Sequence, residues 1–244
     1  MLAVAALATG CQKQTDEVDG AFYTWDNRVV HCAVEADSKT GNDIVSIEAG
    51  LDRARDRGEV FEILIHQPGV SIPWTDFERL LAGVRDRGLA WVTYEDMARG
   101  IPPVGGVSLQ YDGTWIVPWL DSRALLQNYG ARVTIFVTRY TRLTDGERAQ
   151  IRRFADEGGH DVEAHAVNHL RGPFYVEEHG LDAYLDNEVQ PSIDALRADG
   201  YEVVSFAYPF GDRTDEIDRA VGKRVPLLRS LSITRDVVSS PCPH

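Results

Sequence analysis

The sequence alternates between short apolar runs and longer helical segments, and this alternation restricts the fold more than any other feature. Strands separated by helices of about 10–18 residues are typical of βαβ units in a parallel sheet. The predicted strands cover residues 29–34, 60–65, 90–93, 107–111, 132–137, 161–164 and 203–207. The predicted helices cover residues 43–57, 75–87, 120–129, 145–156, 181–199 and 214–221.

The length favours one α/β domain. The chain has 244 residues, and α/β barrels often use about 200–250 residues as a single domain. The one loop that could divide the chain is 99–106, R-G-I-P-P-V-G-G, and neither half beside it is large enough for a closed barrel. We therefore expect an α/β barrel rather than an open doubly wound sheet.

The charge excludes one class of partner. The formal net charge is -13, whereas nucleic-acid binding needs Lys and Arg to neutralise phosphates. The composition therefore predicts no nucleic-acid partner and no polybasic membrane patch.

The N-terminus carries a targeting signal or a chance apolar run. Residues 1–10 are apolar and small, and Cys11 follows them. The run is too short to span a bilayer, which needs about 20 residues. The A-T-G-C ending resembles a bacterial lipobox, in which Cys11 is lipidated; an apolar terminus with a chance cysteine is the alternative. We expect an exported protein, lipid-anchored in the envelope at the periplasm or outer membrane, with membrane contact only through that anchor.

Polar residues follow several predicted strands, at the edge where sites of parallel α/β folds gather. Asp112 follows residues 107–111, and His165 follows 161–164, with His169 four residues later. This spacing predicts that the two imidazoles share one face of a helical turn and can hold one divalent ion. Two histidines and one carboxylate leave open positions on a metal, as in catalytic sites.

Four segments carry a family resemblance. Residues 159–169, G-H-D-V-E-A-H-A-V-N-H, resemble the G-H-E-(I/V)-x-x-H-x-x-x-H segment of polysaccharide deacetylases, carbohydrate esterase family four. Residues 107–112 resemble the strand leading into that family's T-F-D-D motif, and residues 134–137 resemble its A-T-F-F-V strand. F-A-Y-P-F-G at 206–211 is similar to its F-x-x-P-(Y/F)-G motif. The resemblance implies a distorted (β/α)7-type barrel.

The order of the motifs implies circular permutation. E-I-L-I-H at 62–66 is similar to the family's L-x-H motif, and residues 89–97 resemble the strand and helix with which the family's domain ends. We expect a leader and linker at 1–19 and a single catalytic domain at 20–244. Within it, 20–99 corresponds to the family's C-terminal part and 107–244 to its N-terminal part. A truncated tandem array is the alternative.

The resemblance also implies a metal and roles for individual residues. The expected ion is Zn²⁺, with Co²⁺ or Ni²⁺ as alternatives, held by His165, His169 and a carboxylate. Asp112 falls at the position of the base or of that carboxylate ligand, depending on the alignment. His66 is the expected general acid, and the backbone N–H of Phe210 is the expected oxyanion donor. The reaction is removal of N-acetyl groups from an envelope or extracellular polysaccharide of the chitin, peptidoglycan or poly-N-acetylglucosamine type.

Two departures from the family pattern keep other functions open. Gly113 stands where the family has a second aspartate, and Ala207 stands where many relatives carry an arginine that orients the base. Asp121, Glu163 or Asp37 are candidates for the missing carboxylate. The alternatives are a catalytically degenerate glycan-binding lipoprotein, another amide hydrolase on the same scaffold, and a purely structural envelope lipoprotein.

Aromatic residues near the motifs are candidates for substrate contact. Trp115 and Trp119 follow Asp112 closely, and Tyr208 and Pro209 belong to the proline motif. Stacking on sugar rings is the expected role of the tryptophans; packing in the core or rim is the alternative.

Permutation also brings two cysteines together. In the family's order, the C-terminal tail continues into the segment around Cys32, so Cys242 is expected to lie near it. Export would place both in a compartment where disulfides form. A Cys32–Cys242 disulfide is therefore predicted.

Overall fold

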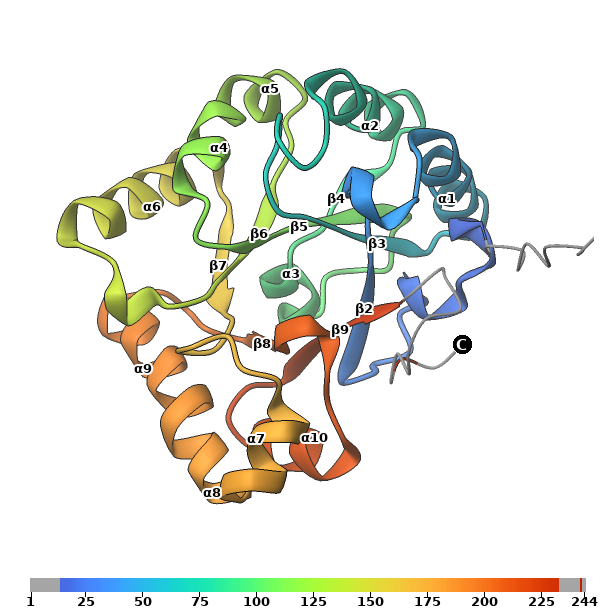
Figure 1. Ribbon diagram of the computed structural model, residues 1–244. Coiled ribbons are helices and arrows are strands. Elements are labelled where there is room, and N and C mark those ends of the chain that lie inside the picture. The colour runs from blue at the N-terminus through green and yellow to red at the C-terminus, as the bar shows by residue number, and fades with distance from the viewer. Residues whose placement is uncertain (1–13, 233–241, 243–244) are drawn as a thin grey trace, which may run out of the picture.

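A closed barrel of seven parallel strands forms the centre of the molecule (Figure 1). The computed structural model describes residues 14–232 and Cys242. The barrel closes because β3 pairs with β5 and β9 pairs with β2, which leaves none of the seven strands with an unpaired edge. This confirms the predicted barrel. Its strands in chain order are β2 (Val30–Glu35), β3 (Val60–Ile65), β5 (Gly106–Gly113), β6 (Val133–Val137), β7 (Asp161–Ala164), β8 (Ser205–Ala207) and β9 (Leu227–Ser232).

Two short strands lie outside the closed ring. β1 (Phe22–Tyr23) pairs antiparallel with β3, and β4 (Ala90–Trp91) pairs parallel with the start of β5. After β4, the chain passes through the helix Tyr94–Arg99 (α3) and returns to the ring as β5, which pairs with β3.

Helices surround the barrel, as Figure 1 shows. Thr144 begins α6 with a capping box to Glu147, as expected for its position before the helix. The helices are α1 (Ile44–Arg57), α2 (Trp74–Asp86), α3 (Tyr94–Arg99), α4 (Ile116–Asp121), α5 (Arg123–Asn128), α6 (Asp145–Gly158), α7 (Gly172–His179), α8 (Leu181–Tyr184), α9 (Gln190–Ala198) and α10 (Asp215–Val221). None of these helices, within the part of the chain that the structure describes, has the length and apolar character needed to cross a bilayer.

Several elements, the short strand β1 among them, differ from the sequence-based expectation. The helix expected at 181–199 is broken by a π-helical turn, Leu185–Val189, just before Pro191, which lacks the N–H that a continuous α-helix would use. The helix expected at 120–129 starts earlier and divides at Ser122 into α4 and α5. Helix α7 and strand β9 were not expected. The L-L-R-S-L-S pattern of β9 concealed a strand, because its Arg and Ser residues are buried.

The barrel interior contains buried polar side chains, whereas the space between barrel and helices is apolar. On β3, Phe61 and Ile63 belong to the large apolar core, and Glu62 between them belongs to a hydrogen-bonded group. Glu62 contacts Nδ1 of His31 at 2.9 Å and accepts a hydrogen bond from the Tyr94 hydroxyl at 2.6 Å. All three are fully buried, so paired polar groups as well as apolar packing stabilise the inside of the barrel.

A disulfide joins the two ends of the described chain. Cys32 on β2 is bonded to Cys242, with 6.1 Å between their Cα atoms and 210 residues between them in sequence. This confirms the predicted pairing. A cross-link over so long a loop restricts the unfolded chain strongly.

We predict that the double change Cys32→Ser and Cys242→Ser lowers the free energy of unfolding by about 2–5 kcal/mol, because it removes that restriction. Urea unfolding of the variant and of the untreated protein measures the difference. The reduced wild type should unfold like the variant. A variant as stable as the oxidised wild type, or two free thiols in the non-reduced protein, would contradict this assignment.

Candidate active site

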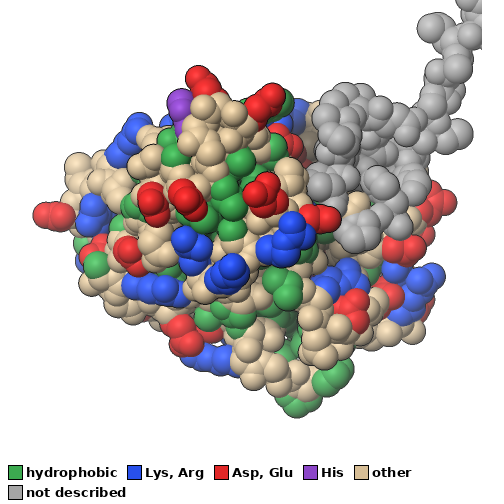
Figure 2. Space-filling view, turned by 90° about the horizontal axis from the view of Figure 1, so that it is seen from below, with side chains coloured by type: hydrophobic (Ala, Val, Ile, Leu, Met, Phe, Trp, Pro, Cys, Tyr) green, Lys and Arg blue, Asp and Glu red, His purple; other side chains and the backbone are tan. Residues whose placement is uncertain are grey.

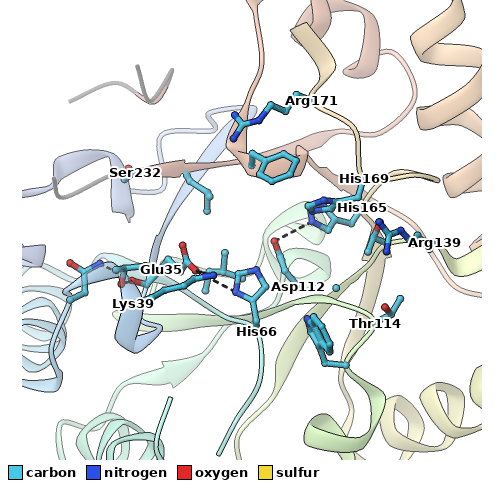
Figure 3. Close-up of a pocket in the computed structure, with 18 residues that line it drawn as sticks. Glu35, Lys39, His66, Asp112, Thr114, Arg139, His165, His169, Arg171 and Ser232 are labelled. Carbon is cyan, nitrogen blue, oxygen red and sulfur yellow. Dashed lines mark hydrogen bonds and ion pairs between the residues drawn. The ribbon is translucent and has the colours of Figure 1, made fainter. Parts of the chain in front are cut away.

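A cavity of about 760 Å³ opens at the carboxyl ends of the barrel strands (Figure 3). It brings together side chains that are far apart in the sequence: Glu35 is the last residue of β2, and Ser232 is the last residue of β9. Its lining includes most of the residues singled out from the sequence. These are His66, Asp112, Gly113, Trp115, His165, His169 and Phe210.

Asp112 forms a buried ion pair at the floor of this cavity. Its Oδ2 contacts Nη2 of Arg229 and lies 3.4 Å from Nε2 of His165. Burial alone would raise the pKa of Asp112, but the charge of Arg229, followed by His165 and His66, lowers it below its ordinary value. Asp112 is therefore ionised at neutral pH. Its other oxygen, Oδ1, is buried without a hydrogen-bond partner among the described residues.

His165 is held as a neutral imidazole. Its Nδ1 lies 2.9 Å from the carbonyl of Ala207, which can only accept, so Nδ1 donates and Nε2 keeps its lone pair toward Asp112. Burial lowers the pKa of His165 to about 3. Burial also lowers the pKa of His169, whose ring centroid is 4.8 Å from that of His165.

The backbone between the two histidines differs from the expectation. The segment after β7 is irregular rather than a helical turn. Ala166 and His169 have φ values of 63° and 61°, in the left-handed region. The two rings approach each other because the loop folds back, not because residues four apart share a helix face.

This donor set fits a divalent cation. Metal binding needs neutral imidazoles and an ionised carboxylate, and these are the protonation states that the pKa shifts favour. The bond from His165 Nδ1 to a backbone carbonyl is the outer contact that orients metal-binding histidines. The unpartnered Oδ1 of Asp112 is a further buried donor atom. Asp112, His165 and His169 are therefore candidate ligands in their protonation states, but their possible ligand atoms do not all lie within 4.8 Å of one another.

A second, tighter group lies across the cavity. Within the described part of the chain, Glu35, Asp37 and His66 bring three possible ligand atoms within 4.8 Å of one another. His66 Nδ1 donates to Asp37 Oδ2 at 2.6 Å, and Glu35 Oε1 is 3.5 Å from the same nitrogen. Asp37 Oδ1 accepts from the Ser71 hydroxyl at 2.5 Å. Because Nδ1 is engaged by Asp37, Nε2 of His66 is the atom left for proton exchange.

His66 and His165 have opposite electrostatic surroundings. Burial by itself would lower the pKa of His66, but the hydrogen bond to Asp37 and the charges of Asp112, Asp37 and Glu35 raise it above its ordinary value. His66 therefore keeps a proton to higher pH than His165, which suits a proton donor.

None of the three candidates for the missing carboxylate lies beside Asp112. Asp121 is exposed on α4 and does not line the cavity. Glu163 is fully buried and accepts hydrogen bonds from the backbone amides of Val204 and Ser205. Asp37 is bonded to His66. The acidic residue that sequence reasoning missed is Glu35, because the end of β2 gave no sign that it faces His66.

The second missed residue is Arg229. The register between β8 and β9 places it directly opposite Ala207, the position at which the family resemblance implies an arginine. Its guanidinium is fully buried and also lies over the ring of Phe136, 4.9 Å from the centroid. The signal that could have found it is an arginine inside an otherwise Leu- and Ser-containing strand.

The aromatic candidates divide into exposed and buried residues. Trp115 is 45% exposed and lines the cavity. Trp119 is only 1% exposed, and its Nε1 donates to the carbonyl of His66 at 2.9 Å. The expectation that Trp119 stacks on sugar is therefore wrong; it holds the His66 backbone instead. Tyr208 and Pro209 are also buried, so neither offers a face to a sugar ring. Cys11 lies outside the described residues.

Phe210 lies in a tight turn after β8. Its φ is 61°, and its side chain is 47% exposed at the cavity. The backbone hydrogen bonds of the turn are donated by Gly211 to Tyr208 and by Asp212 to Pro209. The amide of Phe210 is not one of these donors.

Solved structures of similar fold include deacetylases. The chain is similar to the Streptococcus pyogenes deacetylase PplD in complex with acetate, at 19% identity and a TM-score of 0.56, over 71% of this chain and 92% of that one. It is similar to IcaB from Ammonifex degensii, at 16% identity and a TM-score of 0.58, over 74% and 88%. A de-N-acetylase from Aggregatibacter actinomycetemcomitans matches at 11% identity and a TM-score of 0.53, over 75% and 96%. At these identities the likeness concerns the fold.

The family follows from the sequence match. No curated protein sequence matches the chain. The polysaccharide deacetylase family, in contrast, matches residues 104–226, half of the 244 residues, from the loop before β5 to the end of the α10 region. The matched part includes Asp112, His165 and His169. The chain therefore belongs to the polysaccharide deacetylase family, hydrolases that act on amide bonds.

Proposed function

We propose that this protein is a metal-dependent hydrolase that removes N-acetyl groups from an envelope or extracellular polysaccharide. One observation carries the proposal. The same cavity is lined by Asp112, whose pKa is lowered, by His165, whose pKa is also lowered, and by His66, whose pKa is raised. The first two suit metal binding, and the third suits protonation of a leaving amine. Zn²⁺ is the ion that two histidines and a carboxylate favour, with Co²⁺ or Ni²⁺ as alternatives.

In this proposal, Asp112 alone serves as both the general base and the carboxylate ligand of the metal. Gly113 has no side chain, so we assign both sides of the Asp112 carboxyl group a function. Its Oδ2 faces His165 and, with His169, forms the metal-binding set. Its Oδ1, buried and unpartnered, is the acceptor for the proton of the attacking water. The chemistry supplied by a bound divalent ion is polarisation of the acetamide carbonyl and of water.

The remaining groups act on the acetamide and on the sugar. His66 Nε2 gives its proton to the leaving amine, while Asp37 holds the ring through Nδ1. The Phe210 N–H donates to the oxyanion that develops on the carbonyl oxygen. The exposed ring of Trp115 offers a face on which a sugar can stack.

The second candidate function is glycan binding without turnover. The local structure leaves no room for the second aspartate at position 113. Gly113 has a φ of 113°, and a Cβ there would lie 2.7 Å from Nε1 of Trp115. Trp115 therefore occupies the space that a side chain at 113 would need. This favours a degenerate member if Asp112 cannot serve both roles.

We also propose that the chain is circularly permuted and exported. The family match begins near β5, whereas β2, β3 and His66 precede it in the sequence. β9 pairs in parallel with β2, as consecutive strands of a barrel do, so the two ends of the described chain meet where an unpermuted chain would continue. The Cys32–Cys242 disulfide supports an oxidising compartment. Lipidation at Cys11 remains part of this proposal.

The reaction is tested with acetylated chito-oligosaccharides and Zn²⁺. We predict that the purified protein releases acetate and binds close to one equivalent of metal. His165→Ala should lose metal and reduce acetate release at least about 100-fold, because the donor set is broken. His179→Ala, which changes an exposed histidine on α7, is the matched control and should match the wild type.

Two results would separate the alternatives. Bound metal and glycan affinity without acetate release from any N-acetylated glycan would favour the binding function. Absence of both metal and glycan affinity would favour the purely structural role.

The Asp37–His66 pair predicts the pH dependence. Asp37→Asn removes the negative charge that helps to raise the pKa of His66 and leaves at most a neutral acceptor, so that pKa should fall. His66 then loses its proton at lower pH, and the basic limb of the kcat/KM profile should move to lower pH. A profile measured between about pH 6 and 10 tests this. An unchanged basic limb in a folded variant would remove His66 from the role of general acid.

Arg229 predicts a rescue by its neighbour. Arg229→Ala leaves Asp112 as a buried charge without its cation, so kcat/KM should fall at least about 100-fold and stability by several kcal/mol. Adding Ala207→Arg returns a guanidinium from the paired position on β8 and should restore part of both. Arg229→Lys is the control variant: it keeps a positive charge beside Asp112 and should lose less activity than Arg229→Ala. A folded Arg229→Ala variant with full activity would show that Asp112 does not need this partner.

A further inference from the structure

The cavity is rich in basic groups although the protein is acidic. Lys39, Arg139 and Arg171 line it, against the carboxylates of Glu35 and Asp112. Asp112 is paired with Arg229 beneath it, and Lys39 lies 3.4 Å from Glu35. Arg171 pairs with Asp212, so within the described residues the guanidinium at the wall without an acidic partner is that of Arg139. The face drawn in Figure 2 differs, because acidic and basic side chains are interspersed over it.

Arg139 is the more unusual of the two. It directly follows Thr138 at the end of β6, and its side chain is exposed beside the two histidines (Figure 3). No hydrogen bond or ion pair of its guanidinium is present within residues 14–232. Its φ is 54°, a left-handed conformation that costs energy for a residue other than glycine. Backbone strain at a site residue without a stabilising side-chain contact points to function.

Structural arginines of this protein behave differently. Arg53 binds Glu59 and Asp19, and Arg132 binds Asp96. Each holds two elements together through a carboxylate of the chain itself. Arg139 holds no such pair and points into the cavity, so its carboxylate partner is to be sought in the ligand.

Arg171 is held in a fixed orientation near the histidines. Its guanidinium lies 4.1 Å from the centroid of the Phe210 ring, and Asp212 pairs with its Nη1. Phe210 in turn lies 4.7 Å from His169, ring to ring. The histidine pair thus has a stacked cation near one side and the unpaired Arg139 near another.

We propose that the glycan deacetylated here is anionic, and that Arg139 binds a carboxylate of a sugar acid next to the N-acetyl group. The inference rests on the proposed function for the position of the acetamide. A guanidinium matches a carboxylate through two parallel hydrogen bonds, which gives orientation as well as affinity. The unpaired charge of Arg139 attracts such a ligand to the cavity although the protein as a whole carries a net charge of -13.

Equilibrium binding tests this separately from catalysis. Titration calorimetry on the metal-loaded His66→Ala protein, which is expected not to turn substrate over, compares two tetrasaccharides with equal numbers of N-acetyl groups. One is neutral, N-acetylglucosamine tetramer; the other alternates N-acetylglucosamine with carboxylate-bearing N-acetylmuramic acid. We expect the acidic tetramer to bind at least about tenfold more tightly at low salt. The preference should shrink at 0.5 M salt, because the Debye length falls to about 4 Å and the charges are screened.

Variants identify the residue responsible. Arg139→Gln should reduce the preference to less than about twofold, and Arg139→Lys should keep an intermediate preference because it retains charge but not the planar fork. Arg57→Gln is the matched control: it removes the same charge from the exposed end of α1, away from the cavity, and should leave the preference intact.

Equal affinity for the two tetramers, or an undiminished preference in Arg139→Gln, overturns the proposal. Failure of the unmodified protein to release acetate from either tetramer, with the binding preference and its loss in Arg139→Gln both present, overturns the proposed deacetylation and leaves recognition of an anionic glycan standing.

Discussion

The ion pair between Asp112 and Arg229 is the interaction on which the site depends. A carboxylate buried at the mouth of a barrel would take up a proton unless a cation kept it charged. Arg229 supplies that cation from β9, the strand that closes the barrel against β2. The charge of Asp112 then determines what His165 faces and which atoms can hold a cation. Barrel closure and site chemistry are therefore linked through one pair of residues 117 positions apart.

The same cavity holds two histidines in opposite states, and the difference comes from their partners. His165 donates to a neutral carbonyl and is deeply buried, so it stays unprotonated. His66 donates to a buried carboxylate, so it keeps its proton more readily. Environments that push the pKa values of two neighbouring groups apart let one site hold one group protonated and the other unprotonated at the same pH. Trp119 contributes indirectly, by fixing the backbone of His66.

The seven strands of the ring pair in chain order, and the ring closes where the last strand, β9, pairs with the first, β2. Side chains from β2, β3, β5, β7 and β9 meet at one mouth, although the residues that follow β3 and those that follow β7 are about a hundred positions apart. Parallel strands need only regular pairing with their neighbours, so the ring can start at any strand provided that the ends lie close together. The disulfide between Cys32 and Cys242 holds the two ends at that place.

Local patterns in the sequence determined the fold class and part of the site. Apolar runs alternating with capped helices predicted the barrel, because both periodicities are local properties, and the motifs around His165 and Asp112 predicted the family. The tertiary structure alone decided which groups pair. Glu35 and Arg229 entered the site through strand register, which no local pattern encodes. Trp119 left the substrate face because helix α4 turns it inward. The loop from His165 to His169 took left-handed backbone conformations that its residue types do not announce. Burial and pairing are properties of contacts between distant segments, and only the folded chain brings those segments together.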